Sequence, residues 1–163
     1  MAEAGKRILL PLINKDEANL DDKGRLLFSK QKRERLGDVF AISLCDSGCL
    51  AAYPLEIWNA MWARISSYDP LDLTFRKYAE LLYNVADDEV KFDPQNRATI
   101  SKSLRTEGKL TGKVLIFGCG DRAELWDPEE RRKYEEDKAA YARDRREEYE
   151  RAWLQIAETL PRR

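Results

Sequence analysis

The sequence predicts a fold of strands and helices arranged as two similar units that share one core. The first observation is a turn that appears twice, in Leu20–Ser29 and in Phe92–Ser101, with Arg25 and Arg97 at equivalent positions. The second is that each copy is followed by a strand, a turn, a second strand and a proline that can open a helix. The third is size, because units of about 70 residues are near the lower limit for folding alone.

In the first unit, Asp21–Gly24 is a turn signal in which Gly24 can adopt a positive φ. Ser29 is placed to cap a short helix, and Pro54 suits the first position of a longer one. The expected elements are a strand at Leu26–Phe28, a helix at Lys30–Leu36, strands at Val39–Leu44 and Cys49–Tyr53 around a hairpin turn, and a helix at Pro54–Ser66.

The second unit repeats this order, with Asn96 in the place of Gly24. Asparagine tolerates the left-handed conformation better than other residues with a side chain. The expected elements are a strand at Ala98–Ile100, a helix at Lys102–Glu107 capped by Ser101, strands at Val114–Phe117 and Ala123–Trp126, and a helix opened by Pro128.

Two further helices are expected. Leu71–Val85 has an apolar face and links the two units. Pro128–Leu160 reads as one long charged helix with a narrow apolar seam, either solvated with one packed edge or packed along a neighbouring subunit. The seam consists of Tyr134, Tyr141, Tyr149, Trp153, Ile156 and Leu160.

Composition favours a cytoplasmic protein that does not span a membrane. Charged residues make up 36% of the chain, and no apolar run approaches the length of about 18 residues that a membrane helix needs. The apolar run Ile8–Leu10 is too short for a signal peptide. The net charge of -1 hides a basic segment, Leu20–Gly37, whose charge the acidic tail offsets.

The cysteine and histidine counts argue against an enzyme and against a metal site. The chain has three cysteines and no histidine. Serine or cysteine catalysis with a histidine base is therefore excluded, and a structural zinc normally needs four cysteine or histidine ligands. Cys45, Cys49 and Cys119 are expected to be free thiols, and no metal or cofactor is expected.

Several motifs resemble those of the MraZ family of bacterial transcriptional regulators, which carry two SpoVT-AbrB (swapped-hairpin) units. Asp21–Arg25 is similar to the family's D-x-K-G-R turn, and Asp93–Arg97 to its second turn. Leu50–Trp58 is similar to the L-x-x-Y-P-x-x-x-W ending of the first unit. Val114–Gly118 followed by Glu124–Asp127 is similar to the second ending.

The resemblance implies a mixed α/β fold in which two AbrB-like β-hairpin units form a shared β core of the double-psi or swapped-hairpin barrel type. It implies a ring-shaped homo-oligomer that binds short tandem repeats in double-stranded DNA upstream of its own operon. The family represses the division and cell-wall gene cluster, acting in the cytoplasm at the nucleoid. The expected organisation is unit 1 at 18–66, a linking helix at 67–88, unit 2 at 89–133 and a charged C-terminal helix at 128–163.

On this hypothesis Arg25 is the main base-reading residue, because bidentate contact of arginine with guanine is the commonest specific major-groove contact. Gly24 lets the backbone approach the groove, and Lys23 binds phosphate. Arg97 either does the same on the second turn or only pairs with Asp93. Asp21 and Asp93 are expected to hydrogen-bond the backbone amides of the turns, which Asn96 also stabilises. A further basic group is either a solvated helix face or a set of phosphate contacts, and consists of Lys30, Lys32, Arg33 and Arg35.

An interaction protein is the alternative function. In that case the chain is an AbrB-like scaffold or antitoxin whose long C-terminal helix binds a protein partner, since that helix is longer than a two-unit DNA binder needs.

Overall fold

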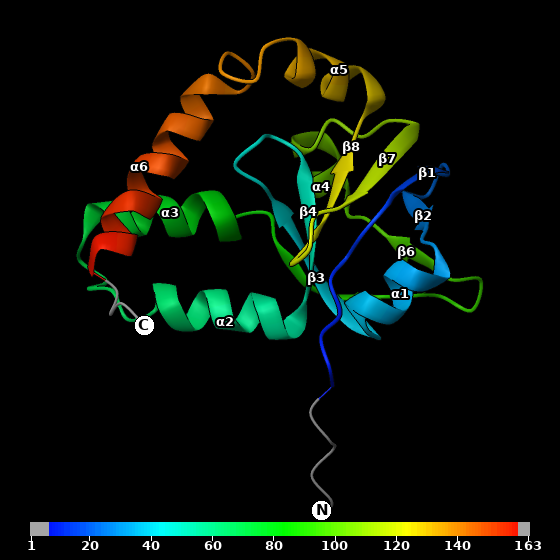
Figure 1. The fold of residues 1–163 in the computed structure, drawn as a ribbon, viewed down its shortest axis with the longest axis horizontal. Helices are drawn as coiled ribbons and strands as arrows, with labels where there is room; N and C mark the ends of the chain where they lie inside the picture. The colour runs from blue at the N-terminus through cyan, green and yellow to red at the C-terminus, as the bar shows by residue number, and fades with distance from the viewer. Residues whose placement is uncertain (1–6, 160–163) are drawn as a thin grey trace, which may run out of the picture.

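The computed structural model describes residues 7–159 and shows a mixed α/β fold (Figure 1). A six-stranded antiparallel sheet has the strand order β1-β7-β8-β4-β3-β5, and a separate two-stranded sheet pairs β2 with β6. The strands are β1 Lys15–Asn19, β2 Arg25–Leu27, β3 Val39–Leu44, β4 Leu50–Pro54, β5 Asp87–Lys91, β6 Arg97–Thr99, β7 Lys113–Gly118 and β8 Ala123–Trp126. The helices are α1 Lys30–Leu36, α2 Leu55–Ile65, α3 Leu73–Tyr83, α4 Lys102–Glu107, α5 Pro128–Glu136 and α6 Arg143–Thr159.

The two halves of the chain share one sheet and one core. The β3–β4 hairpin of the first half joins the β7–β8 hairpin of the second through β4 and β8, with Leu50 opposite Leu125. The principal apolar cluster likewise mixes the halves, since Leu26 and Phe28 lie in it together with Ala98 and Ile100. The expectation that small units would share a core is confirmed.

The short helices after the two turns lie where the sequence predicts them. Ser29 caps α1 by accepting a hydrogen bond from the backbone N–H of Lys32, and Ser101 caps α4 by accepting one from Leu104. These bonds satisfy backbone donors that a helix leaves unpaired in its first turn. The repeat in sequence is therefore a repeat in local structure.

Two edge strands were not predicted. β1 and β5 lie at opposite edges of the large sheet, and most of their residues are exposed or half-buried. Their sequences are polar and show no apolar run of the kind that identifies a buried strand. Pairing with β7 and β3, which are rich in apolar residues, holds them in place.

The prediction of one long C-terminal helix is wrong, because the tail forms α5 and α6 with a break between them. The aromatic seam has two different partners, and a straight helix could not reach both. Tyr134 and Tyr141 pack on Trp126, with ring centroids 4.9 and 5.9 Å away. Tyr149 and Trp153 instead pack on Tyr78 of α3. Leu160 and the side chain of Ile156 lie outside the described part of the chain.

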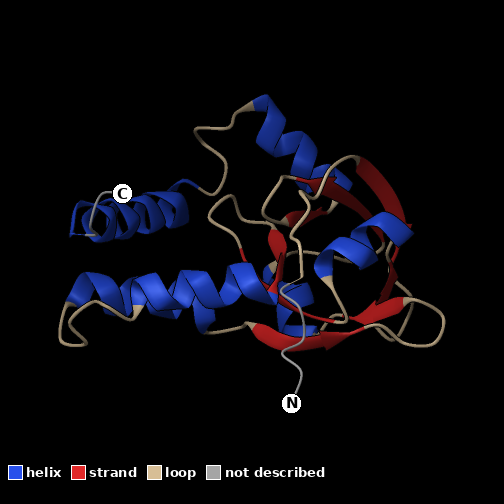
Figure 2. Cartoon of the chain, turned by 60° about the horizontal axis from the view of Figure 1, so that its bottom comes forward, coloured by secondary structure: helices blue, strands red, loops and turns tan. Residues whose placement is uncertain are grey.

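Helices α2, α3 and α6 form a helical arm that extends away from the strands (Figure 2). The predicted helices Pro54–Ser66 and Leu71–Val85 correspond to α2 and α3. A second apolar cluster connects the arm to the sheet and includes Tyr53, Trp58, Tyr78 and Trp126. Among the described residues, no helix combines the length and apolar character required to cross a membrane.

Candidate nucleic-acid interface

The two arginine-bearing turns meet at a small β-ribbon made of β2 and β6. The strands run antiparallel with Leu26 opposite Ala98, and both of these side chains are buried in the core. Because side chains alternate along a strand, the residues on either side point outward. We call this outward surface the ribbon face; it consists of Arg25, Leu27, Arg97 and Thr99.

Asp21 organises the first turn and holds Arg25. Its Oδ1 accepts hydrogen bonds from the backbone N–H groups of Lys23 and Arg25, at 3.0 and 2.8 Å. Its Oδ2 accepts a hydrogen bond from Arg25 Nε at 2.5 Å. Gly24 has φ 78° in this turn, a conformation that glycine adopts without steric cost. One carboxylate therefore fixes both the turn and its arginine.

The second turn has the same geometry. Asp93 Oδ1 accepts from the backbone N–H groups of Gln95 and Arg97, each at 2.9 Å, and Oδ2 accepts from Arg97 Nε at 3.0 Å. Asn96 has φ 67° and takes the place of Gly24. The expected difference between a principal first copy and a weaker second one has no counterpart in the bond between each aspartate and the Nε of its arginine.

Both aspartates are stabilised as anions. The pKa of Asp21 is lowered chiefly by the backbone N–H of Arg25, and the pKa of Asp93 by that of Arg97. The four side chains are between 28 and 29% exposed, so solvent screens these ion pairs. The charges of both turns therefore balance locally near neutral pH.

Arg25 and Arg97 differ in how many of their terminal nitrogens are free to bind an external acceptor. Within the described residues, Arg25 uses only Nε for hydrogen bonding. Arg97 additionally donates from Nη2 to Gln95 Oε1 at 3.2 Å, and its Nη1 lies 3.7 Å from Asp21 Oδ2. A guanidinium held through Nε still presents two terminal N–H groups, which match a phosphate or the edge of guanine.

Lys23 and Gly24 have opposite environments. Lys23 is exposed, and its side chain has no partner within residues 7–159. Gly24 is buried, and a Cβ placed there would lie 2.7 Å from Arg105 Nε and 2.9 Å from the carbonyl oxygen of Ile100. The missing side chain of Gly24 therefore makes room for Arg105 and Ile100 of the protein itself, and its approach to a groove stays a prediction.

Lys32 is a buried structural residue. Its side chain is 1% exposed, and Nζ donates to the carbonyl oxygens of Ile13 and Asn14 and to Asp16 Oδ2, at 2.9, 3.0 and 2.6 Å. An ammonium group has three donors, so all of them are used. This corrects both interpretations of Lys32, as a solvated residue and as a phosphate contact.

The rest of the basic group is divided. Lys30 is exposed, and its Nζ lies 3.8 Å from Glu34 Oε1. Arg33 instead donates from Nε to the carbonyl oxygen of Phe28. Arg35 donates to the carbonyl oxygen of Pro11. Lys30 thus stays accessible and Arg33 is half-buried, whereas Arg35 connects α1 to the segment before β1.

The comparisons with known proteins place the chain in a family. The family model described as "MraZ protein, putative antitoxin-like" matches residues 85–154. A protein named "Transcriptional regulator MraZ" from Ligilactobacillus salivarius is 35% identical over 107 residues, covering 66% of this chain and 74% of that protein. The chain belongs to the MraZ family. Proteins of the same name from Lactiplantibacillus plantarum, 36% identical over 127 residues (76% of this chain and 87% of that protein), and Halothermothrix orenii, 32% over 108 residues (66% and 75%), are also similar.

Arg105 of this MraZ-family chain was not among the basic residues that the sequence predicted for the interface. Arg105 donates from Nε to the carbonyl oxygen of Ile100 at 3.0 Å, just as Arg33 does to Phe28. Arg33 and Arg105 stand at the same distance along the chain from Arg25 and Arg97. The internal repeat itself could therefore have identified Arg105, had it been followed beyond the turn.

Proposed function

We propose that this chain is a DNA-binding transcriptional regulator that contacts double-stranded DNA through its ribbon face. The observation that carries the proposal is the pair of arginines on β2 and β6, each held through Nε by an aspartate of its own turn. Its relatives bear the name "Transcriptional regulator MraZ", which agrees with this function.

The geometry suits readout of a groove. A two-stranded β-ribbon fits the major groove of B-DNA. An arginine that is already oriented loses less conformational freedom when it binds, so more of the contact energy contributes to affinity. In our proposal Arg25 and Arg97 donate to guanine edges. Lys23, Lys30 and Arg33 contact phosphates and set the register.

The proposed assembly is a ring-shaped homo-oligomer on short tandem repeats. One ribbon offers few contacts, and several subunits on repeated sites would gain affinity from their linkage. Apart from Leu27 on the ribbon face, the large exposed apolar residues of the described chain lie in two separate places, which allows the head-to-tail contacts that close a ring. They are Ile8, Leu9, Leu10 and Ile13 before β1, and Trp62, Leu71, Leu73, Trp153 and Leu154 on the helical arm and its α2–α3 connection.

The finer parts of the proposal concern organisation and target. We propose two AbrB-type swapped-hairpin units, 18–66 and 89–133, because the strands that follow the two turns pair with each other across the halves. The proposed target is the tandem repeats upstream of the protein's own operon. The proposed action is repression of the division and cell-wall gene cluster, in the cytoplasm at the nucleoid.

Fluorescence anisotropy on labelled DNA containing the upstream repeats tests the proposal. The Arg25→Ala variant is expected to lose sequence-specific binding. DNA binding by the wild-type protein is expected to weaken steeply as the salt concentration rises, because binding releases counterions from the phosphates. The matched control is Arg132→Ala, which removes an exposed, ion-paired arginine from α5. Equal affinity of the Arg25→Ala variant and the control would refute the ribbon as the DNA contact.

An interaction protein is the second candidate function. The observation that favours it is the exposed apolar end of the helical arm, where Leu73 and Leu154 are 72% and 62% exposed. A chain that stops after Ala142 separates the two ideas. Retained DNA binding and an unchanged oligomer in mass photometry would assign α6 to another protein partner, whereas loss of the oligomer would assign α6 to self-assembly.

A further inference from the structure

We propose that Cys45, Cys49 and Glu124 bind a thiophilic divalent cation of the zinc class. The two Sγ atoms and a carboxylate oxygen of Glu124 all lie within 4.8 Å of one another, and all three residues are buried. Two thiolates with one carboxylate form a ligand set that suits zinc, because sulfur ligands select thiophilic metals over magnesium or calcium.

The fold places the three ligands on neighbouring strands. Cys45 and Cys49 flank the turn between β3 and β4, where the backbone N–H of Cys45 donates to the carbonyl oxygen of Cys49 at 2.8 Å. Glu124 lies on β8, opposite Ala51 of β4. The site therefore joins the hairpin of the first half to a strand of the second half.

Two side chains fix the orientation of the Glu124 carboxylate. Arg122 Nη2 donates to Oε2 at 2.6 Å, and Trp126 Nε1 donates to Oε1 at 3.1 Å. Such outer contacts hold a ligating carboxylate in place and are a regular part of metal sites. Cys45 Sγ already lies 3.9 Å from Oε2, so only a small movement is required to bring both onto one ion.

The cluster has an excess of negative charge when both thiols ionise. Two thiolates and the Glu124 carboxylate then face the Arg122 guanidinium, which also pairs with Asp121, and the Asp46 carboxylate lies beside Cys45. A divalent cation offsets part of this negative charge, and binding releases one proton from each thiol.

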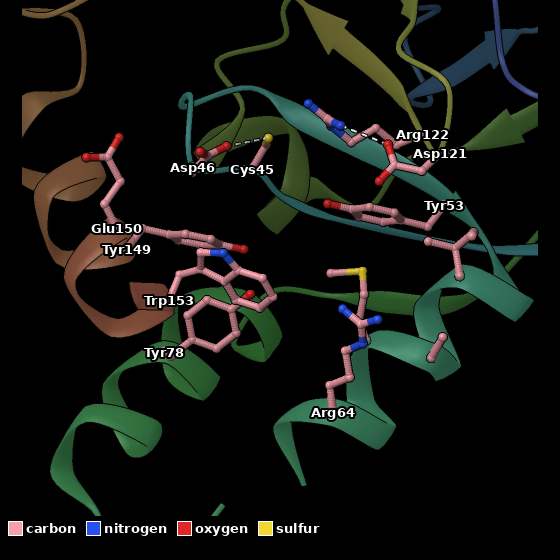
Figure 3. A pocket seen from close by; sticks show the side chains of 13 residues that line it. Cys45, Asp46, Tyr53, Arg64, Tyr78, Asp121, Arg122, Tyr149, Glu150 and Trp153 are labelled. Atoms are coloured by element: carbon pink, nitrogen blue, oxygen red, sulfur yellow. Dashed lines mark hydrogen bonds and ion pairs between the residues drawn. The ribbon is translucent and has the colours of Figure 1, made fainter. Parts of the chain in front are cut away.

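A cavity reaches one of the three proposed ligands, Cys45. It has a volume of about 520 Å³ and is lined by Cys45 and Asp46 together with Tyr53, Tyr78 and Trp153 (Figure 3). Asp46 Oδ1 lies 3.0 Å from Cys45 Sγ. With three protein ligands, zinc commonly takes a water as its fourth ligand. The expectation of no metal counted only cysteine and histidine and left out Glu124.

Titration of the full-length reduced protein with Co²⁺ tests the site, because cobalt bound to thiolates absorbs in the near ultraviolet. One Co²⁺ per chain is expected, with the band lost in Cys45→Ser and in Cys49→Ser. The matched control Cys119→Ser removes an exposed thiol outside the cluster and should keep the band. Glu124→Gln should weaken the affinity by at least about tenfold.

Thiol labelling of the unchanged protein does not depend on how the variants fold. Zn²⁺ is expected to slow modification of Cys45 and Cys49 by a maleimide, mapped by mass spectrometry, and to leave Cys119 unaffected. The proposal is overturned if the protein gives no cobalt–thiolate band, if the band depends on Cys119, or if Zn²⁺ protects neither Cys45 nor Cys49.

Discussion

At the scale of single residues, one aspartate in each turn binds both the backbone of the turn and the side chain of its arginine. Asp21 and Asp93 use one oxygen for the turn and the other for the arginine Nε. Lysine could not replace arginine here, because a single ammonium cannot pair with the aspartate and present two further donors in one plane.

The first prediction follows from the matching geometry of the two turns. Arg97→Ala should reduce affinity for the specific DNA about as much as Arg25→Ala, by about 1–3 kcal/mol each. Anisotropy titrations of both variants at one salt concentration measure this. A large loss for Arg25→Ala with full affinity for Arg97→Ala would restore the hypothesis of a principal first turn.

The second prediction concerns the buried ammonium of Lys32. Lys32→Met leaves the carbonyl oxygens of Ile13 and Asn14 without their donor, which should lower the free energy of unfolding by about 1–3 kcal/mol. Urea unfolding measures the loss. The DNA affinity of the folded variant should stay unchanged, and a clear drop would show that Lys32 does contact phosphate.

At the scale of elements, the break between α5 and α6 lets one tail serve two surfaces. Tyr141 lies in this break and donates from its hydroxyl to Glu130 Oε2 at 2.6 Å, which ties the connection back onto α5. Lys109 and Lys133 also lie within 4 Å of the same carboxylate. The tail is thus held against the sheet before it turns toward α3.

The third prediction is a pH dependence of this connection. The hydroxyl of Tyr141 is the main cause that lowers the pKa of Glu130 below its ordinary value of 4.5. A lowered pKa adds stability above the unfolded-state value and loses it as the pH falls through the folded-state value. The difference in thermal midpoint between the unchanged protein and Glu130→Gln should therefore be constant from neutral pH to about pH 5 and shrink below pH 4.5. A constant difference at all pH values would contradict this account.

At the scale of the whole molecule, the large sheet takes strands from both halves, so neither half has a complete sheet of its own. The fourth prediction is a single unfolding transition. Urea unfolding followed by far-ultraviolet circular dichroism and by tryptophan fluorescence should give coincident curves at equal protein concentration. Two separated transitions would indicate two units that fold independently.

The sequence predicted the elements that carry strong local signals. Capping serines, turn residues and apolar runs placed α1, α4, β3 and β8 within a residue or so, because those signals act over a few neighbouring positions. The polar edge strand β1 and the break between α5 and α6 were missed. Both depend on distant partners, namely β7 for the strand and Trp126 and Tyr78 for the tail.

The sequence predicted which residues make up the candidate site, but not how deeply they are buried or which residues surround them. The sequence identified Arg25, Arg97 and both aspartates from the repeated turn. It could not reveal that Lys32 is buried or that Gly24 packs on Arg105, because burial is decided by which elements meet in space. The same reason hid Glu124, which approaches Cys45 and Cys49 only through the pairing of β4 with β8.

The pairing of β2 with β6 has a consequence for how such a chain could arise. Each half supplies one strand of the ribbon, so a single half could complete it only by associating with a second identical polypeptide. Joining the halves covalently makes that encounter intramolecular and independent of protein concentration. It also allows the two copies to differ in sequence. At the equivalent positive-φ positions of the two turns, one copy has Gly24 and the other has Asn96.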